Sequence, residues 1–396
     1  MALLLPFLFL SCVSQGARTQ FEKVRRPQSQ ERLKGVWVAA ISGNYPRQKT
    51  TDALKLKADC DFVVDQCARL GFNAIFFQVR PSCDALYNSK LFPWSAWLTG
   101  QEGLAPDEGF DPLAYMCQAA HKNNISLHAW INPYRIKAKK GQGLDELLES
   151  RPALKPLKKF ILPCSDGNFY LDPGEPRVRA FIVRGAKEIM QNYDVDGLHI
   201  DDYFYPQAAQ ADFANFDDSA SWQKYGTGDS LEDFRRQSAT LLVKELFGAV
   251  HQTKSGAVFG VSPFGIWGNK SAQNPYGSAT RGTESYSEHC ADTIAWIQME
   301  CVDYIVPQIY WERGNKAADY AELASWWNRA VEGSEVALYI GLADYKAAAD
   351  LGKAQSPWRG REELEAQLEL NKTLNNVAGE VHFNFDSVLK LANMEF

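Results

Sequence analysis

Two adjacent carboxylates, Asp201 and Asp202, stand at the end of a short apolar run in the segment DVDGLHIDDYFYP. Paired carboxylates can divide acid–base chemistry between them, because one can donate a proton while the other acts as a base or a nucleophile. An alternative exists for Asp202, since an Asp that ends a strand often caps the next helix. The Tyr-Phe-Tyr-Pro that follows is a poor helix start, and we therefore expect both carboxylates to take part in chemistry.

Eight short β-rich runs recur along the chain, each followed by a stretch with helical periodicity. Repeated strand–helix units predict parallel strands, and eight of them predict an α/β fold with a closed (β/α)8 TIM-like barrel. We expect this barrel to form a single domain over residues 34–396. The runs are 35–41, 74–80, 126–132, 196–202, 257–265, 303–311, 336–345 and 380–388.

Alternation within each run predicts which side chains face the lumen of the barrel. One set of alternate residues should be apolar and face the helices, while the other set can become polar near the carboxyl end. Asp201 belongs to the lumen-facing set, at the end of the barrel where such enzymes keep their chemistry. In the eighth run the alternation predicts that Val381 and Phe383 face outward and that His382 and Asn384 face inward.

Aromatic and neutral polar side chains gather near the ends of the predicted strands. Sugar rings lie with their C–H faces on aromatic planes, and their hydroxyl and acetamido groups need hydrogen-bond partners. We interpret this lining as a sugar-binding surface, although any one aromatic residue could instead serve the core. The substrate-binding candidates are Trp37, Arg80, His128, Trp130, Asn132, Tyr203, Trp267, Gln308, Tyr310 and Asn384. The long segment 137–171, which contains the helical pattern LDELLES, is expected to form a flap over the mouth.

Composition and charge disfavour several other classes of function. The chain has 396 residues, of which 45% are hydrophobic and 23% charged, as in an ordinary globular protein. A net charge of −6 without a dense Lys/Arg tract disfavours nucleic-acid binding. Zinc-site spacings and the HExxH motif are absent from the sequence, so we expect neither a metal nor another cofactor.

The amino terminus has the character of an export signal. Residues 2–11 form an apolar run that is too short to span a bilayer but long enough for the core of a signal peptide. The sequence LFLSC, ending at Cys12, is similar to a lipoprotein cleavage site; plain secretion and a mis-assigned start are the alternatives. We expect residues 1–12 to be the signal, residues 13–33 to be a polar tether, and the protein to reach the cell envelope. A lipid on Cys12 would be its only membrane attachment.

Two cysteines lie in the helix that is predicted to follow the first β-rich run. Cys60 and Cys67 lie seven residues apart in a helical pattern. Seven helical residues separate Cα atoms by about 10 Å, whereas a disulfide tolerates about 7 Å. Both cysteines are therefore expected to be reduced and buried. The sequence does not indicate an oligomeric state.

Seven segments, taken in order, resemble the family 10-like glycosyl hydrolases, a bacterial family of barrel proteins. They are KGVWVA, GFNAIFFQVRP, LHAWINPYR, YLDPGEPRVR, VDGLHIDDYFYP, GVSPFGIW and DYIVPQIYW, and they span most of the region from residue 34 to residue 390. The resemblance implies a TIM-like barrel that hydrolyses glycosidic bonds. The family includes outer-membrane lipoproteins that act on peptidoglycan glycan strands, so the resemblance also implies a glycan stripped of its stem peptides as the best-matched substrate.

Glycosidic cleavage needs one carboxyl group as an acid and a second as a nucleophile or base. Glu312 is the predicted partner of the Asp pair, because it shares the lumen-facing parity of the sixth run; a surface ion pair with Arg313 is the alternative. In a second mechanism the acetamido oxygen of the substrate attacks, the Asp pair suffices, and Glu312 only binds. A non-catalytic glycan-binding barrel and a metal-dependent barrel hydrolase remain as other classes of function.

Overall fold

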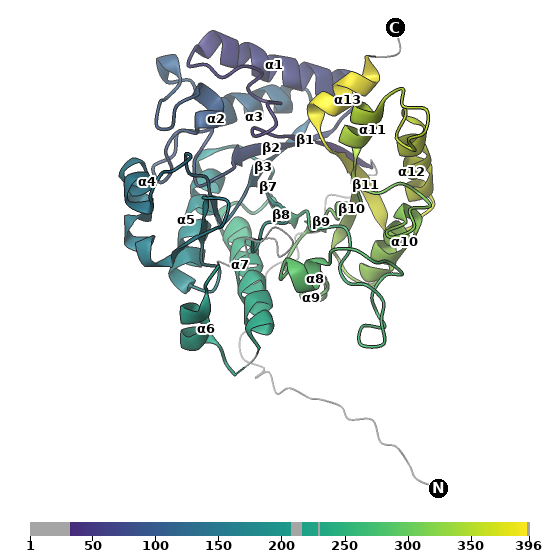
Figure 1. Cartoon of the computed structure of the whole chain (residues 1–396). Helices are drawn as coiled ribbons and strands as arrows, with labels where there is room; N and C mark the ends of the chain where they lie inside the picture. Colours follow the sequence, from purple (N-terminus) through teal and green to yellow (C-terminus); the bar gives the residue numbers. More distant parts are fainter. Residues whose placement is uncertain (1–31, 207–215, 229, 394–396) are drawn as a thin grey trace. The chain divides into compact units, whose positions relative to one another are not determined.

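Eight parallel strands form a closed barrel in the computed structural model, which describes residues 32–206, 216–228 and 230–393 (Figure 1). The order of the strands around the barrel is β1-β11-β10-β9-β8-β7-β3-β2. The strands are β1 (Leu33–Val38), β2 (Ala74–Arg80), β3 (Ser126–Ile131), β7 (Gly197–Ile200), β8 (Val258–Val261), β9 (Tyr304–Ile305), β10 (Ala337–Leu342) and β11 (Val377–His382). Each lies in or overlaps one of the eight predicted runs, and the predicted (β/α)8 fold is confirmed.

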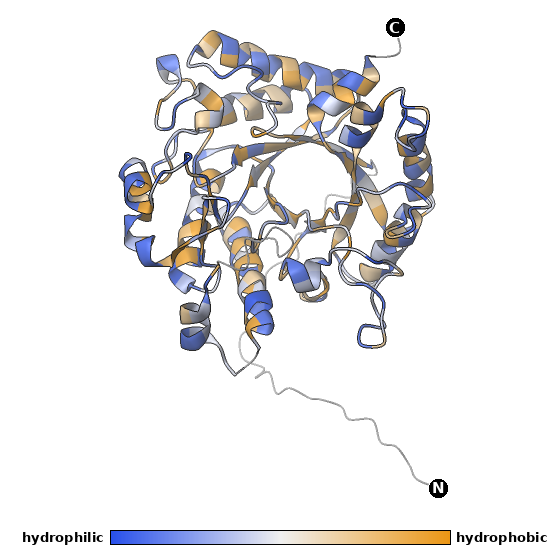
Figure 2. Cartoon of the chain, in the orientation of Figure 1, coloured by the Kyte–Doolittle hydropathy of each residue, from blue (hydrophilic) through white to orange (hydrophobic). Residues whose placement is uncertain are grey.

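Helices surround the barrel and carry both hydrophobic and hydrophilic residues, as Figures 1 and 2 show. Side-chain caps start several of them: Asp52 and Asp111, for example, each accept hydrogen bonds from two backbone N–H groups of the first turn. The longer helices are α1 (Ala53–Arg69), α3 (Pro112–Lys122), α5 (Pro176–Asn192), α7 (Leu231–Thr253), α10 (Tyr320–Ala330), α12 (Glu362–Lys372) and α13 (Phe385–Ala392). The shorter ones are α2 (Ala96–Thr99), α4 (Leu144–Ser150), α6 (Ser219–Tyr225), α8 (Ser285–Glu288), α9 (Thr293–Gln298) and α11 (Asp344–Asp350).

The apolar core has two parts. The larger part lies between the strands and the helices, and the smaller part fills the lumen of the barrel. The lumen cluster consists of Trp37, Ala39, Ala74, Phe76, Trp130, Tyr304, Val306, Ala337 and Val381. The barrel is therefore a packed support for the residues at its carboxyl end rather than an open channel.

The insertion between β3 and α5 forms a small subdomain beside the mouth. It contains an antiparallel sheet of β4 (Arg135–Ile136), β6 (Phe169–Leu171) and β5 (Ile161–Pro163), together with α4, whose sequence is the predicted LDELLES, and a 3-10 helix, Pro152–Phe160. Arg151 anchors this flap: its guanidinium pairs with Glu102 at 2.8 Å and donates to the carbonyl oxygens of Ser82 and Lys137.

The parity predicted for the eighth run is wrong. Val381 packs in the lumen cluster and Phe383 packs against it. His382 faces outward, with Nδ1 3.0 Å from an oxygen of Asp344. The strand also ends at His382, and Asn384 caps α13 by accepting a hydrogen bond from the backbone N–H of Ser387. Hydrophobicity misleads here because the lumen of this barrel is itself apolar, whereas the outward side chain His382 is polar and is paired with Asp344.

The predictions for Cys60 and Cys67 are confirmed. Cys60 and Cys67 are free and buried on α1, and burial raises the pKa of both thiols. The predicted signal, residues 1–12, and almost all of the predicted tether lie outside the described residues. In the part of the chain that the structure describes, none of the helices is both apolar enough and long enough to cross a bilayer.

Candidate active site

Asp201 and Asp202 directly follow β7 at the carboxyl end of the barrel, and both side chains are buried. Both oxygens of Asp201 accept hydrogen bonds: Trp130 Nε1 donates to Oδ2 at 3.1 Å, and Asn132 Nδ2 donates to Oδ1 at 3.0 Å. Trp130 lies on the neighbouring strand β3, and Asn132 follows it directly. The structure thus brings together three of the predicted site residues, and the two donors fix the orientation of the carboxylate.

The environment of the acid pair favours retention of a proton. Burial, and then the charge of Asp202, raise the pKa of Asp201 to about 7, although Arg135 and the two N–H donors act in the opposite direction. Burial also raises the pKa of Asp202, against the charge of His289. Because the two carboxyls titrate together, the pair retains a proton near neutral pH. Such a pair can act as an acid and as a base within one catalytic cycle.

Gln308 and Tyr310, both predicted, lie on the Asp202 side of the site. The Gln308 side chain hydrogen-bonds to Asp202 and also donates from Nε2 to the carbonyl oxygen of Ser262 at 2.9 Å. Burial and the nearby charges of Tyr345 and Asp202 raise the pKa of Tyr310. Both side chains are partly exposed, so they can meet a ligand at the mouth.

Three aromatic rings form a wall at the mouth. Tyr310, Tyr345 and Phe383 have pairwise ring-centroid distances of 5.7, 5.9 and 6.0 Å. Tyr345 is 36% exposed, and the other two are partly buried. Rings placed in this way can receive the C–H faces of sugars. Tyr345 was not predicted as a site residue; it lies in the first turn of α11, shortly after β10. Phe383 was predicted to face outward.

Arg135 and His289 are two further site residues that the sequence analysis did not single out. Arg135 acts electrostatically on both carboxylates, and its guanidinium lies 4.6 Å from the centre of the Tyr203 ring. His289 is buried and stacks on Phe264 at 5.0 Å. Arg135 could have been suspected, because it follows Asn132 by three residues in the segment NPYR. No comparable signal marks His289, which reaches the site from the region after β8.

A cleft of about 360 Å³ opens between the flap and the barrel. Its lining comes from the flap, from α2 and from the segments that follow β1, β2 and β7, including Tyr203, which is next to Asp202 in the chain. The lining residues are Ile41, Pro81, Ser82, Trp97, Arg135, Ile136, Lys137, Cys164, Asp166, Asn168, Phe169, Tyr170, Tyr203 and Pro206. The cleft therefore adjoins the acid pair.

Arg80 does not lie at the mouth, and this prediction of its position is wrong. The register between β2 and β3 passes from the pair Gln78–Trp130 directly to the pair Arg80–Ile131, so β2 contains one extra residue. Such a bulge turns the following side chain to the other face of the sheet. The guanidinium of Arg80 is buried 4.6 Å from the centre of the Phe92 ring, and a Cβ added to Gly185 of α5 would lie 2.3 Å from Nη1.

Two other candidates lie deeper in the lumen. Trp37 Nε1 donates to His199 Nε2 at 3.2 Å, and His128 Nδ1 lies 2.9 Å from the hydroxyl of Tyr304. His128 precedes Asn132 by four residues, which corresponds to about 13 Å along an extended strand. Burial lowers the pKa of His128 to about 4, so this ring is neutral at physiological pH. Both residues fill the barrel beneath the acid pair.

Trp267 and Asn384 have structural partners away from Asp201. The indole of Trp267 stacks on Trp326 of α10 at 5.8 Å, and Asn384 caps α13. Neither residue has a described contact with the acid pair. Their assignment to substrate binding therefore remains a prediction without geometric support.

Glu312 lies in the turn after β9. Its Oε1 accepts a hydrogen bond of 2.8 Å from Asn315, and its charge acts on Lys346, which donates to the carbonyl oxygen of Tyr310. The alternative ion pair with Arg313 is not formed, because Arg313 pairs with Glu363 at 3.3 Å. Glu312 is thus close to the aromatic wall, and its catalytic role remains a prediction.

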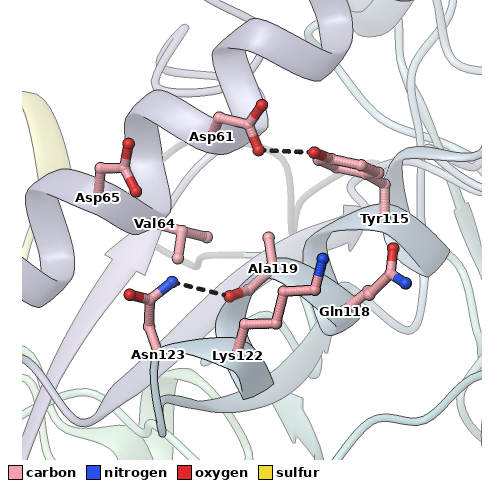
Figure 3. A pocket seen from close by; sticks show the side chains of 8 residues that line it. All are labelled: Asp61, Val64, Asp65, Tyr115, Gln118, Ala119, Lys122 and Asn123. Carbon is pink, nitrogen blue, oxygen red and sulfur yellow. Dashed lines mark hydrogen bonds between the residues drawn. The ribbon is translucent and has the colours of Figure 1, made fainter.

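A second concavity lies outside the barrel, between α1 and α3 (Figure 3). It measures about 90 Å³, and its Asp61 accepts a hydrogen bond of 2.7 Å from the hydroxyl of Tyr115. This groove belongs to the helical layer and does not include the acid pair. Among residues 32–206, 216–228 and 230–393, the His, Cys, Asp and Glu side chains form no group that could hold a metal ion.

Comparison with known proteins agrees with this geometry. Residues 32–360 match the family model of glycosyl hydrolase-like 10 proteins. Glycosyl hydrolase YngK of Bacillus subtilis is 38% identical over 367 residues, which cover 92% of this chain and 70% of that protein. Glycosyl hydrolase DigH of Escherichia coli is 36% identical over 381 residues, which cover 92% of this chain and 85% of that protein.

Solved structures share the fold at low sequence identity. The glycoside hydrolase domain of PgaB (BpsB) from Bordetella bronchiseptica superposes with a TM-score of 0.55 at 12% identity, covering 92% of this chain and 97% of that chain. The catalytic domain of a β-amylase from Paenibacillus polymyxa gives a TM-score of 0.51 at 12% identity, covering 90% of this chain and 92% of that chain. From the match to the family and the similarity to its named members, we conclude that the chain belongs to the glycosyl hydrolase-like 10 family and is a glycoside hydrolase.

Proposed function

We propose that this glycoside hydrolase cleaves N-acetylated glycan strands of the bacterial cell wall, and that peptidoglycan strands without stem peptides are its substrate. The observation that carries the proposal is the buried pair Asp201–Asp202, in which the pKa of Asp201 is raised to about 7. A carboxyl that retains its proton near neutral pH can protonate the oxygen of a leaving sugar. The aromatic wall beside the pair supports a sugar as the ligand.

The adjacent pair suits a mechanism in which the acetamido group of the substrate is the nucleophile. The acetamido oxygen attacks the anomeric carbon, the bond from this carbon to the glycosidic oxygen breaks, and the protonated carboxyl gives its proton to the leaving oxygen. The ionised carboxylate holds the acetamido N–H during this attack. Water then attacks the anomeric carbon, its proton passes to the carboxylate that acted as the acid, and the acetamido group is restored.

Hydrogen bonds around Asp201 support this mechanism. Trp130 and Asn132 direct N–H groups at both oxygens of Asp201, so its carboxylate does not need to reorganise during the reaction. Glu312, which is engaged with Asn315, then contributes to binding rather than to covalent chemistry. Direct displacement by a carboxylate, with Glu312 as the partner of the Asp pair, is the competing mechanism.

Two measurements test the function and the mechanism separately. The purified protein is incubated with peptide-free peptidoglycan strands, and mass spectrometry identifies the ends of the products. New reducing ends are expected; intact strands at stoichiometric enzyme would contradict the proposed substrate. A thiazoline analogue of the N-acetyl sugar should then inhibit strongly, because it mimics the cyclic intermediate of the acetamido route. Weak inhibition of an active enzyme would favour direct displacement instead.

The proposal extends to location in the cell envelope. The apolar run at residues 2–11 supports export, and the sequence LFLSC supports a lipid on Cys12. Fractionation of cells that express the full chain tests this part. The unchanged chain should sediment with membranes, and a Cys12→Ala variant should not; the same distribution for both would contradict the anchor.

A further inference from the structure

The cleft beside the acid pair carries an excess of positive charge. Lys137 and Arg135 line the cleft, and Lys49 contacts the ring of Trp97, which is also in the lining. In the described part of the chain, none of these three cations forms an ion pair with a carboxylate. Asp166 is the acidic residue of the lining, and its oxygens accept hydrogen bonds from the backbone and the side chain of Asn168.

Arg151, a neighbouring cation in the same flap, behaves differently. Arg151 is paired with Glu102 at 2.8 Å and also donates hydrogen bonds to two backbone carbonyl oxygens, so its charge is already balanced. The chain as a whole has a net charge of −6. Three cations without an ion pair to a described residue stand at this cleft against one acidic residue of the lining, Asp166. This positive charge is therefore a local feature and does not follow from the overall composition.

Aromatic faces hold the three cations in place. The Nζ atoms of Lys137 and Lys49 lie 4.3 and 4.5 Å from the centre of the Trp97 ring, and the guanidinium of Arg135 lies 4.6 Å from the centre of the Tyr203 ring. A cation on an aromatic face is attracted by the ring and keeps further N–H donors for another partner. Ordering the charges before binding reduces the conformational entropy that is lost when a ligand arrives.

We infer that this cleft is a subsite for a sugar that carries a negatively charged carboxylate substituent. This inference rests on the proposed function and specifies it. In peptidoglycan every second sugar carries a lactyl ether with a free carboxylate once the stem peptide has been removed. The sugar with the carboxylate lies on the flap side of the acid pair, and its substituent meets Lys137, Lys49 and Arg135. A neutral N-acetylated glycan lacks this contact and binds more weakly.

The test compares one glycan in two charge states. Peptide-free peptidoglycan strands are used as they are and after conversion of their carboxylates to methyl amides, and kcat and KM are measured on both. For the unchanged enzyme, KM for the native strands should be roughly tenfold lower than for the amidated strands. In the double variant Lys49→Gln, Lys137→Gln this ratio should fall close to one. Both lysine side chains are exposed, so the variant should fold normally.

Matched controls separate a local effect from a general effect of charge. Lys372, which pairs with Glu369 on α12, is the control: Lys372→Gln removes one positive charge elsewhere and should leave the ratio unchanged. Addition of salt should reduce the ratio, because exposed charges are screened. Equal KM values for both glycans with an active unchanged enzyme would overturn the inference while leaving the proposed function in place. Cleavage of neither glycan would overturn both.

Discussion

Asn132 Nδ2 donates a hydrogen bond of 3.0 Å to Asp201 Oδ1, which joins the end of β3 to the end of β7. The orientation of the acid is therefore set by a neighbouring strand and not by the loop that follows Asp201. Trp130, two residues earlier on β3, holds the other oxygen of the same carboxylate. One edge of β3 thus sets the geometry of Asp201, and its two donors lower the pKa of Asp201 against the larger effects of burial and of Asp202.

Removal of either donor should raise the pKa of Asp201. Trp130→Phe keeps an aromatic side chain but removes the N–H group together with part of the indole, while Asn132→Ala deletes the other donor. Each donor stabilises the ionised carboxylate, so its loss favours the protonated form. The alkaline limb of the profile of kcat/KM against pH should move to higher pH in both variants. We expect kcat/KM at its optimum to fall by roughly tenfold or more. An unchanged alkaline limb in both variants would contradict the role of these hydrogen bonds.

The raised pKa of Asp201 should also appear in the stability of the protein. Folded Asp201 keeps its proton up to a pH of about 7, whereas an unfolded Asp loses it near pH 4. Between these values the folded state binds more protons, so the contribution of Asp201 to the free energy of unfolding falls as the pH rises. Asp201→Asn cannot titrate, so it removes this decrease in the free energy of unfolding. The Tm difference, variant minus unchanged protein, should become more positive from pH 4 to pH 8. Asp65→Asn on the exposed face of α1 is the control, and an equal difference at both pH values for Asp201→Asn would contradict the shift.

Glu312 distinguishes the two mechanisms. If the Asp pair and the acetamido group of the substrate suffice, Glu312→Gln should lower kcat/KM by less than about tenfold, because it removes only a binding contact. Loss of an essential acid or base lowers the rate by roughly 10²- to 10⁴-fold. Steady-state kinetics on peptide-free strands, with Asp201→Asn in the same assay for reference, makes the comparison. A loss for Glu312→Gln as large as that for Asp201→Asn would favour direct displacement.

Arg80 is expected to have a structural role only. Two of its nitrogen atoms, Nε and Nη1, are buried without a hydrogen-bond partner among the described residues. Arg80→Met should therefore leave kcat/KM within about threefold of the unchanged enzyme, because it removes a buried unpaired charge far from the substrate. Gly185→Ala should destabilise the fold by about 1–3 kcal/mol, since its Cβ would collide with Arg80 and Phe92. Thermal unfolding measures the stability of both variants, and steady-state kinetics measures their activity. A large loss of activity in a folded Arg80→Met variant would contradict a purely structural role for Arg80.

The barrel and the acid pair could be predicted because they depend on local patterns. Strand alternation identified the lumen face of β7, and counting the strand–helix units identified the closed barrel. Arg80 was misplaced because a single extra residue reverses the face of a strand and leaves no mark in the hydrophobic pattern. His289 and Tyr345 were missed for another reason: they come from segments after the strands, and only the folded chain brings them to the mouth.

Cleavage of peptide-free peptidoglycan strands by the unchanged enzyme and by the single variants Asp201→Asn and Asp202→Asn tests the central claim most directly. The appearance of new reducing ends is measured over time, and the products are identified by mass spectrometry. Asp65→Asn, which changes an exposed carboxylate on α1, serves as the control. The unchanged enzyme and the control should cleave the strands, and each site variant should lose roughly 10²-fold or more of the rate while remaining folded. Strands left intact by the unchanged enzyme, or cleaved equally well by both site variants, would contradict the assignment of this reaction to the Asp201–Asp202 pair.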